Sequence, residues 1–350
     1  MHKIDIHLDK FGFPKKPTQN YKISILKEKK IFFFSKFFRK FDLCMKLPSY
    51  DLIKNYYGDS HLDNFYYNKI KSLNFNKIFL IKINLKLIAM FSFVFFKKEN
   101  IRLRDGDILL FGPFSHSYHH AIYEYFLRLT YLKSIGFRNI IWLPYNLKLI
   151  LKSNFYRKLF KNLNFNFYDT NNNNVFENCS YLTHVNTRWY IKNNKKLISN
   201  EFSYLLKNFR KNIFQTHPYI KNNKYKFIIV SRSNFSRKLI NENELYKKLK
   251  KYNFNIVNLE NYSYQEQINI ARNCKIMIGY HGGGLTNTIF MKPKSSFIEI
   301  FNRYYKNPCY KNSSKIIKLR YKSFECEKSY KNLDGICDIS QLEKYIQKIV

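Results

Sequence analysis

Glycine is scarce in this chain, because its 350 residues include only ten glycines, well below the usual share of about 7%. Four of the ten nevertheless stand together, at Gly279, Gly282, Gly283 and Gly284. Glycine permits positive φ angles and lets another group approach the backbone closely. The sequence therefore predicts a backbone here that needs positive φ or close approach to a ligand.

Other absences exclude whole classes of protein. The six cysteines form no C-x-x-C pair, so we expect mostly buried thiols in a reducing compartment. The N-terminus lacks the apolar core of a signal peptide. The apolar stretches 31–41 and 87–96 are too short or too interrupted by lysine to span a bilayer. The pattern favours a cytoplasmic protein, with peripheral contact with an anionic membrane as an open alternative.

Acidic residues are also few: 24 of them face 62 lysines and arginines, which gives a net charge of +38. Such a charge invites a nucleic-acid-binding interpretation. The lysines, however, are scattered among abundant Asn, Ile, Phe and Tyr, as in products of AT-rich genomes, and no specific nucleic-acid-binding motif accompanies them. We therefore interpret most of the charge as solvated surface with some attraction to anionic membranes or phosphorylated ligands.

The glycine cluster lies inside a strand–turn–helix–strand pattern. Strands are expected at 276–280 and 296–301, with a short helix at 285–291. A turn between a parallel strand and a helix directs free N–H groups and the positive end of the helix dipole at one spot, which attracts phosphate. The spacing disfavours a dinucleotide fingerprint and excludes a Walker loop. A tight structural turn is the alternative.

Length and pattern predict an α/β protein with two domains. The expected divisions are an irregular lead-in at 1–70, a first domain at 71–215, a second domain at 216–335 and a terminal helix at 336–350. The first domain is expected to contain paired strands at 77–96, a hairpin at 101–111, strands at 139–143 and 165–168, and helices at 147–160 and 195–211. The second is expected to contain strands at 225–231 and 255–259, and helices at 241–252 and 263–273 that begin with the capping boxes Asn241/Glu244 and Ser263/Glu266.

Several polar side chains converge if the second sheet is parallel, because ligands bind at the carboxyl ends of such strands. Arg232 and Arg237 follow the strand at 225–231, and His281 follows the strand at 276–280. Two arginines can grip a diphosphate bidentately, and the carboxylate of Glu299 suits ribose hydroxyls. The combination predicts a nucleotide-diphosphate pocket, although either arginine alone is more typical of a surface position.

A helix with one apolar stripe carries His120 and Glu124 four residues apart, on one face. A histidine beside a carboxylate is suited to general-base catalysis, and a capping and packing pair is the alternative. Zinc bound by these two residues with His116 and His119 is conceivable, but no second ligand cluster supports it.

The segment Asp105-Gly-Asp107 is similar to the Asp-x-Asp metal clamp of some sugar transferases. Asp-Gly between two strands is also a strong hairpin signal. We therefore interpret the segment as a turn and predict no metal site.

The second half contains two distinctive segments, SRSNFSRKLINENEL and SYQEQINIARNCKIMIGYHGGGLTNTIFMKPKSSFIEI. Together they resemble glycosyltransferase family 61, which carries an R…R-x-x-x-N-E segment and an H-G-x-G-L-T-N block. The helix YHHAIYEYFLRL is similar to that family's H-x-x-x-E…L helix through His120, Glu124 and Leu129. Gly283 stands where alanine is common and Lys294 where glycine is common.

The resemblance implies a GT-B architecture, with two facing Rossmann-like domains, parallel sheets and a last helix that crosses back to the first domain. It implies an inverting transfer, without metal or other cofactor, from a nucleotide sugar, expected to be a UDP-sugar, to a glycan, lipid-linked glycan or glycoprotein acceptor. The expected donor site comprises Arg232, Arg237, His281, Gly282, Gly283, Gly284, Thr286 and Glu299. His120 with Glu124 is the expected base, and His281 the expected hydrogen-bond donor to phosphate or sugar.

Three rival functions stay open. A polysaccharide pyruvyl transferase has a similar two-domain α/β fold and would use phosphoenolpyruvate. A basic nucleic-acid-binding protein would show steeply salt-dependent binding. A degenerate transferase kept as a scaffold would bind nucleotide without transfer.

Overall fold

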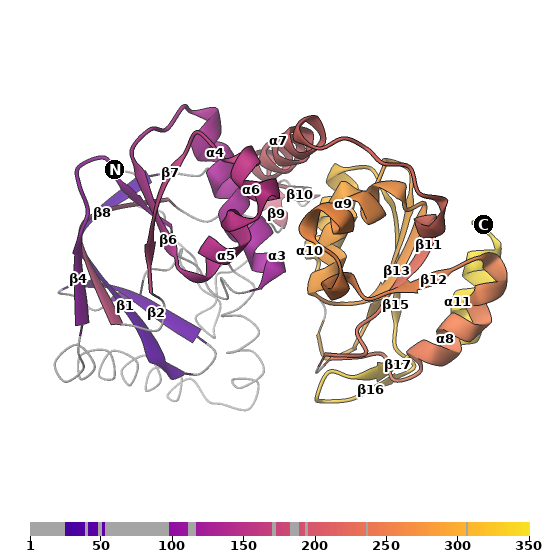
Figure 1. Ribbon diagram of the computed structural model, residues 1–350. Helices are drawn as coiled ribbons and strands as arrows, with labels where there is room; N and C mark the ends of the chain where they lie inside the picture. The colour runs from indigo at the N-terminus through magenta and orange to yellow at the C-terminus, as the bar shows by residue number, and fades with distance from the viewer. Residues whose placement is uncertain are drawn as a thin grey trace. The chain divides into compact units, whose positions relative to one another are not determined.

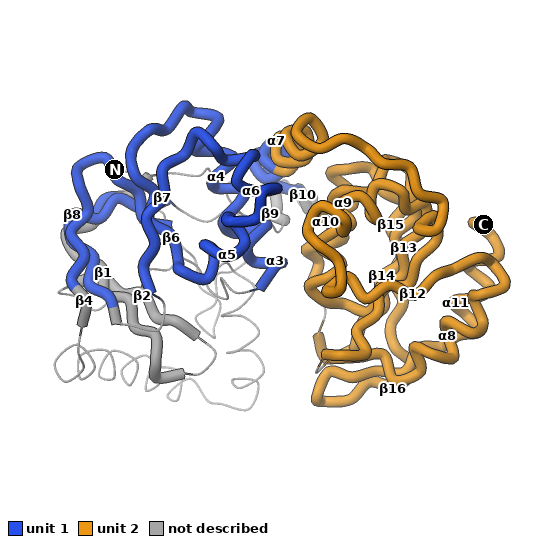
Figure 2. The backbone as a smooth tube through the Cα atoms, viewed as in Figure 1, with its two compact units in different colours: residues 1–205 blue, residues 206–350 orange. Residues whose placement is uncertain are grey.

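The computed structural model describes residues 25–38, 41–47, 51–52, 98–110, 117–169, 173–182, 189–192, 195–235, 237–305 and 307–350. The paired strands expected at 77–96 and the residue His116 lie outside these ranges. The chain divides into two compact units, 1–205 and 206–350 (Figure 2). The division falls inside helix α7 (Asn200–Thr216), earlier than the boundary expected after residue 215.

The first unit contains a mixed sheet of eight described strands in the order β3-β2-β1-β8-β5-β6-β7, with β4 also paired to β8. Strands β4 to β8 pair in parallel, whereas β1 to β3 extend β8 in antiparallel fashion. The strands are β1 (Ile25–Phe38), β2 (Phe41–Leu47), β3 (Asp51–Leu52), β4 (Lys98–Arg102), β5 (Ile108–Leu109), β6 (Ile140–Pro144), β7 (Asn164–Tyr168) and β8 (Asn173–Leu182). The purely parallel sheet expected here is therefore only partly correct.

The helices of this unit follow the expected alternation with local differences. They are α3 (Tyr118–His120), the π-helix η2 (Ala121–Phe126), α4 (Leu127–Ser134), α5 (Asn146–Lys152) and α6 (Asn154–Leu159), beside a two-stranded sheet of β9 (Trp189–Lys192) and β10 (Lys195–Ile198). The helix expected at 147–160 breaks at Ser153, whose side chain caps α6. The helix expected at 195–211 begins only at Asn200, after strand β10.

The hairpin expected at 101–111 is wrong. Strands β4 and β5 both pair in parallel with β8. The turn at Asp105 and Gly106 exists, with a positive φ of 85° at Gly106, but it carries the chain from one parallel pairing to another. The local sequence predicted the turn and could not show which strands it joins.

The second unit is built on a fully parallel sheet of five strands in the order β12-β11-β13-β14-β15. Its elements in chain order are η3 (Asn223–Tyr225), β11 (Phe227–Val230), α8 (Glu242–Leu249), η4 (Lys250–Tyr252), β12 (Asn255–Val257), η5 (Leu259–Asn261), α9 (Tyr264–Asn273), β13 (Ile276–Tyr280), η6 (Gly283–Phe290), β14 (Ser296–Phe301), α10 (Cys309–Ile316), β15 (Arg320–Glu325), β16 (Lys328–Ser329), β17 (Gly335–Ile336) and α11 (Ile339–Gln347). The strands predicted at 276–280 and 296–301 are confirmed.

Helices lie on both faces of this sheet (Figure 1). Helices α8 and α11 pack together on one face, over a core that includes Leu245, Ile278, Ile298 and Ile346. Helices α9 and α10 lie on the other face, where both contact the 3-10 helix η6. The last helix thus has core contacts in the second unit, through Leu342 and Ile346.

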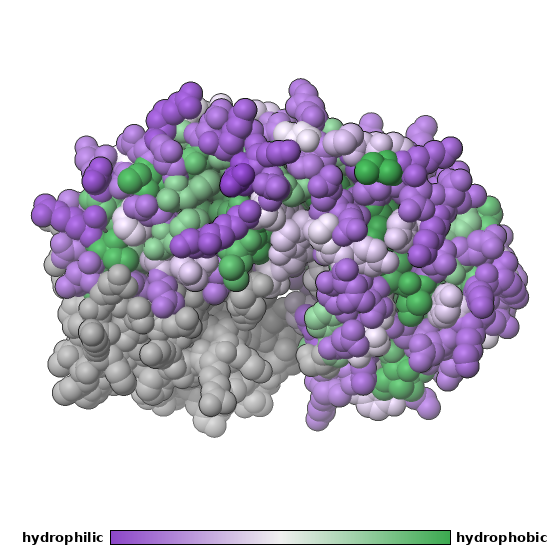
Figure 3. All heavy atoms as spheres, viewed as in Figure 1, coloured by the Kyte–Doolittle hydropathy of each residue, from purple (hydrophilic) through white to green (hydrophobic). Residues whose placement is uncertain are grey.

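The surface of the described residues is mainly hydrophilic on the face shown in Figure 3, with apolar residues in small groups. This agrees with the interpretation of the lysines as solvated surface. In the described part of the chain, no helix has the length and apolar character that a membrane crossing requires.

Candidate functional site

The strand order of the second unit reverses between β11 and β13. From β11 the chain passes to β12 on one side, and from β12 it returns to β13 on the other side. Ligands of open α/β sheets bind at such a reversal, outside the carboxyl ends of the strands. Ser231 and Arg232 follow β11, while His281 and Gly282 follow β13. The candidate site is therefore the place where these two strands end.

Gly282 lies directly against the guanidinium group of Arg232. A Cβ atom built on Gly282 would be 1.7 Å from Nη1 of Arg232. The φ angle of Gly282 is 173°, an extended conformation that any residue adopts, and none of the four clustered glycines lies in the left-handed region of φ. The expectation of positive φ is thus wrong, and close approach is the reason for glycine here. The approaching group is a side chain of the site itself.

The backbone after β11 is anchored by Glu242 of α8. Ser231 donates from Oγ to Glu242 at 2.5 Å, and the N–H of Arg232 donates to the other carboxylate oxygen at 3.1 Å. The Nε of Arg232 donates to the carbonyl of Arg237 at 2.9 Å. Burial, followed by the charge of Arg237, lowers the pKa of Arg232. The two arginines therefore concentrate positive charge beside the glycine turn.

A pocket lies next to this turn, lined by Arg237, Tyr280, His281, Asn302, Tyr305 and Leu333. The guanidinium of Arg237 lies 5.3 Å from the centre of the Tyr305 ring, and the same ring lies 5.1 Å from the ring of His281. The structure thus brings Arg232, Arg237, His281 and Gly282 together, as the sequence predicted. Tyr305 was missed, because a loop aromatic residue gives no pattern.

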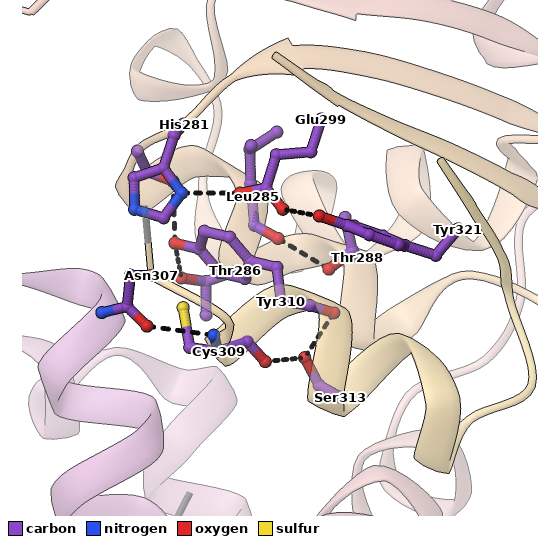
Figure 4. A network of polar contacts seen from close by, with 11 residues as sticks. His281, Leu285, Thr286, Thr288, Glu299, Asn307, Cys309, Tyr310, Ser313 and Tyr321 are labelled. Carbon is purple, nitrogen blue, oxygen red and sulfur yellow. Dashed lines mark hydrogen bonds and ion pairs between the residues drawn. The ribbon is translucent and has the colours of Figure 1, made fainter. Parts of the chain in front are cut away.

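Glu299 lies behind His281 rather than in the pocket (Figure 4). Its Oε1 is 2.6 Å from Nδ1 of His281, and its Oε2 accepts a hydrogen bond of 2.9 Å from the hydroxyl of Tyr321. The carboxylate is completely buried. Both carboxylate oxygens are therefore engaged inside the protein, and a role of Glu299 in ribose binding stays a prediction.

Tyr321 belongs to β15, which sequence reasoning did not predict. Burial raises the pKa of its hydroxyl, and the charge of Glu299 raises it further. The hydroxyl therefore stays protonated and acts as a donor to the carboxylate. The exposed, charged pattern of β15 hides its pairing with β14 from sequence inspection.

Thr286 also lies inside the turn instead of facing the pocket. Its side chain is completely buried, and its Oγ1 is 3.3 Å from the hydroxyl of Tyr310, which donates to the carbonyl of Gly282 at 2.8 Å. Asn287 donates to the carbonyl of Gly284 at 3.2 Å and so helps to hold the turn. A Cβ atom on Gly283 would meet nothing within 4 Å. The backbone at Gly283 is thus the open part of the turn.

The first unit contains a second histidine–glutamate pair. His120 and Glu124 contact each other, with Nδ1 and Oε1 2.7 Å apart, as their spacing predicted. The π-helix η2 begins directly after His120 and contains Glu124. The contact is confirmed, and the catalytic role stays a prediction.

Asp107 has a structural role in the first unit. Its carboxylate accepts hydrogen bonds from the N–H groups of Arg104 and Ile140, each at 3.2 Å, and from Nε1 of Trp142 at 3.4 Å. The carboxylate therefore fixes the turn before β5 to the start of β6. Within the described ranges, no cluster of three or more His, Cys, Asp or Glu side chains is arranged to hold a metal ion.

Comparison with known proteins identifies the family of this chain. The model of the family described as glycosyltransferase 61 matches residues 118–298, just over half of the chain. The chain therefore belongs to glycosyltransferase family 61.

Similar proteins include the EGF domain-specific O-linked N-acetylglucosamine transferases of animals. The protein of Rattus norvegicus is 34% identical over 98 residues, which are 27% of this chain and 18% of that protein. The protein of Drosophila melanogaster is 33% identical over 105 residues, which are 29% of this chain and 20% of that protein. The similarity therefore spans about a fifth of these relatives.

Proposed function

We propose that the chain is an inverting, metal-independent glycosyltransferase that moves a sugar from a UDP-sugar to a glycan acceptor. The observation that carries the proposal is the packing of Arg232 on Gly282 where the strand order reverses, with Arg237 beside it. These arginines and the open backbone of Gly283 suit the two phosphates of a nucleotide sugar.

The leaving diphosphate develops negative charge in the transition state. Two arginines held by hydrogen bonds and ring contacts supply fixed positive charge at that place, which is the kind of stabilisation that a metal ion provides in other transferases. Asp107, the best candidate for a metal-binding carboxylate in the sequence, is committed to three donors. Both observations favour a reaction that proceeds without a divalent cation.

The acceptor hydroxyl needs a base on the side of the sugar opposite to the diphosphate. We assign this role to His120, oriented by Glu124 at 2.7 Å. The names of the similar animal proteins make UDP-N-acetylglucosamine the first donor to test. The acceptor is a glycan, a lipid-linked glycan or a glycoprotein.

A thermal-shift screen with nucleoside diphosphates tests the donor site, because a ligand specific for the folded protein raises its melting temperature. We expect UDP to raise it, with and without EDTA, and Arg237→Ala to remove the shift. Lys311→Ala, in helix α10, is the control for lost surface charge. A shift with phosphoenolpyruvate alone would favour the pyruvyl transferase, and steeply salt-dependent RNA binding without any nucleotide shift would favour the nucleic-acid-binding alternative.

A further inference from the structure

The hydrogen bond between His281 and Glu299 determines which ring nitrogen of the neutral histidine carries hydrogen. An ionised carboxylate only accepts hydrogen bonds, so Nδ1, at 2.6 Å from Oε1, carries the hydrogen. Tyr321 donates to Oε2 from the other side at 2.9 Å. In the neutral form of the ring, the chain Tyr321–Glu299–His281 therefore leaves the second nitrogen, Nε2, as an acceptor.

Three aromatic rings hold the imidazole in place. The ring of Phe301 stacks on it at 5.1 Å with an interplanar angle of 22°, and the rings of Tyr305 and Tyr310 lie at 5.1 Å and 5.4 Å. Figure 4 shows the second ring nitrogen on the side away from Glu299. His281 also lines the pocket, together with Arg237.

Two of the polar side chains that line the pocket, Arg237 and His281, match different partners. Arg237 can only donate, which suits a phosphate oxygen, whereas neutral His281 can only accept at Nε2. A phosphate oxygen also accepts, so it does not match Nε2. A hydroxyl group matches both, because it donates one hydrogen bond and accepts others.

We propose that Nε2 of His281 accepts a hydrogen bond from a hydroxyl group of the nucleotide sugar. Glu299 and Tyr321 are positioning residues that fix the tautomer and the orientation of the His281 ring. This inference rests on the proposed function and replaces two expectations from the sequence. His281 is an acceptor instead of the expected donor to phosphate or sugar. His281, rather than Glu299, recognises a hydroxyl group. Glu299 and Tyr321 both lie beyond the residues 118–298 that match the family model.

The first test is the tautomer itself, measured by ¹⁵N NMR on the full chain labelled at histidine, without nucleotide. We expect His281 to carry its hydrogen on Nδ1. The amide of the Glu299→Gln variant can donate, so it should shift the hydrogen to Nε2 with little change in shape, as a carboxylate-to-amide change does in serine proteases. The matched control is Glu343→Gln on helix α11. In the wild type, the carboxylate of Glu343 accepts a hydrogen bond of 3.2 Å from the hydroxyl of Tyr252. Hydrogen on Nε2 in the wild type would overturn the inference.

The second test is discrimination between hydroxyl-containing ligands and deoxy analogues by titration calorimetry. A deoxy analogue that lacks the hydroxyl group bound by His281 should bind the wild type about tenfold more weakly than the parent ligand. The same analogue should bind Glu299→Gln nearly as well as the parent ligand does. UDP against 2′- and 3′-deoxy-UDP tests a ribose hydroxyl, and UDP-N-acetylglucosamine against its deoxy analogues tests a sugar hydroxyl. Tyr321→Phe should give a partial loss, and Tyr252→Phe, which removes another Tyr–Glu bond, should give none.

The outcomes separate this inference from the function on which it rests. If UDP binds but no deoxy analogue is discriminated, the role of His281 is wrong while the donor site stands. If the wild type binds no nucleotide, the proposed function fails, and the role of His281 fails with it.

Discussion

Among the described residues, the pairs His120–Glu124 and His281–Glu299 have nearly the same contact distance and different surroundings. In the first unit, Nδ1 of His120 lies 2.7 Å from Glu124, and the two side chains are 10% and 13% exposed. In the second unit, Nδ1 of His281 lies 2.6 Å from Glu299, which is not exposed at all. A contact distance alone therefore does not distinguish their roles.

The difference lies in what fixes each pair. His120 and Glu124 are four residues apart on one helical segment, so their contact depends on local geometry. His281 directly follows β13, Glu299 lies within the adjacent strand β14, and Tyr321 from a third strand holds the same carboxylate. The first pair is suited to exchange a proton with an incoming hydroxyl, and the second is suited to hold one orientation.

The largest effect should separate the two histidines by kinetics. His120→Gln should lower kcat by about 10²- to 10⁴-fold, the usual contribution of a general base, with little change in the affinity for UDP. His281→Gln should instead weaken donor binding about tenfold, as expected for one lost hydrogen bond. Steady-state transfer assays and calorimetry with UDP would measure both. An equal loss of kcat in both variants would remove the distinction between the pairs.

Stability should separate the two glutamates. Glu299→Ala leaves the Nδ1–H of His281 and the hydroxyl of Tyr321 without their buried acceptor, so we expect a loss of about 3–5 kcal/mol. Glu124→Ala should cost about 1 kcal/mol, because its pair is partly exposed. Hydrogen exchange of amides in β14 and in α4 would report the two units separately. Equal protection losses would show that burial does not distinguish the pairs.

The contrast also explains what the sequence could predict. Patterns within a few residues were informative: the strand at 276–280, the contact of His120 with Glu124, and the capping box of Ser263 with Glu266 were all predicted and found. The other predicted capping box failed. Asn241 bonds the backbone N–H and carbonyl of Cys337 instead, so a distant segment competes for its side chain.

The features that the sequence could not predict depend on which strands pair and on how deeply each side chain is buried. The register of β13 with β14 places Gly279 opposite Glu299, but only the coordinates show that the carboxylate points into the core towards Tyr321. The glycine cluster was recognised correctly as a special backbone, but for an incomplete reason. Close approach at Gly282 comes from Arg232, which is 50 residues earlier in the chain.

The turn beside His281 offers a smaller test of how tightly that site is packed. Gly282→Ala would place a Cβ atom 1.7 Å from Nη1 of Arg232, so the guanidinium must move. We expect a loss of about 1–3 kcal/mol of stability, typical of overpacking. Gly283→Ala is the matched control for stability, because its Cβ atom would meet nothing within 4 Å. Urea unfolding and hydrogen exchange of the β13 amides would compare the two variants. Equal losses of stability in both variants would contradict the packing argument.

The smallest expected difference concerns the rings that neighbour each histidine. Phe301 stacks on His281 at 5.1 Å, so Phe301→Leu removes an aromatic contact worth about 0.5–1.5 kcal/mol. His119 meets His120 edge-on at 5.2 Å and is itself partly exposed. We expect His119→Leu to change local stability by less than about 0.5 kcal/mol, as is usual near a surface. If hydrogen exchange showed the larger loss in the first unit, the tighter hold on His281 could not be attributed to its aromatic neighbours, and the buried carboxylate alone would have to explain it.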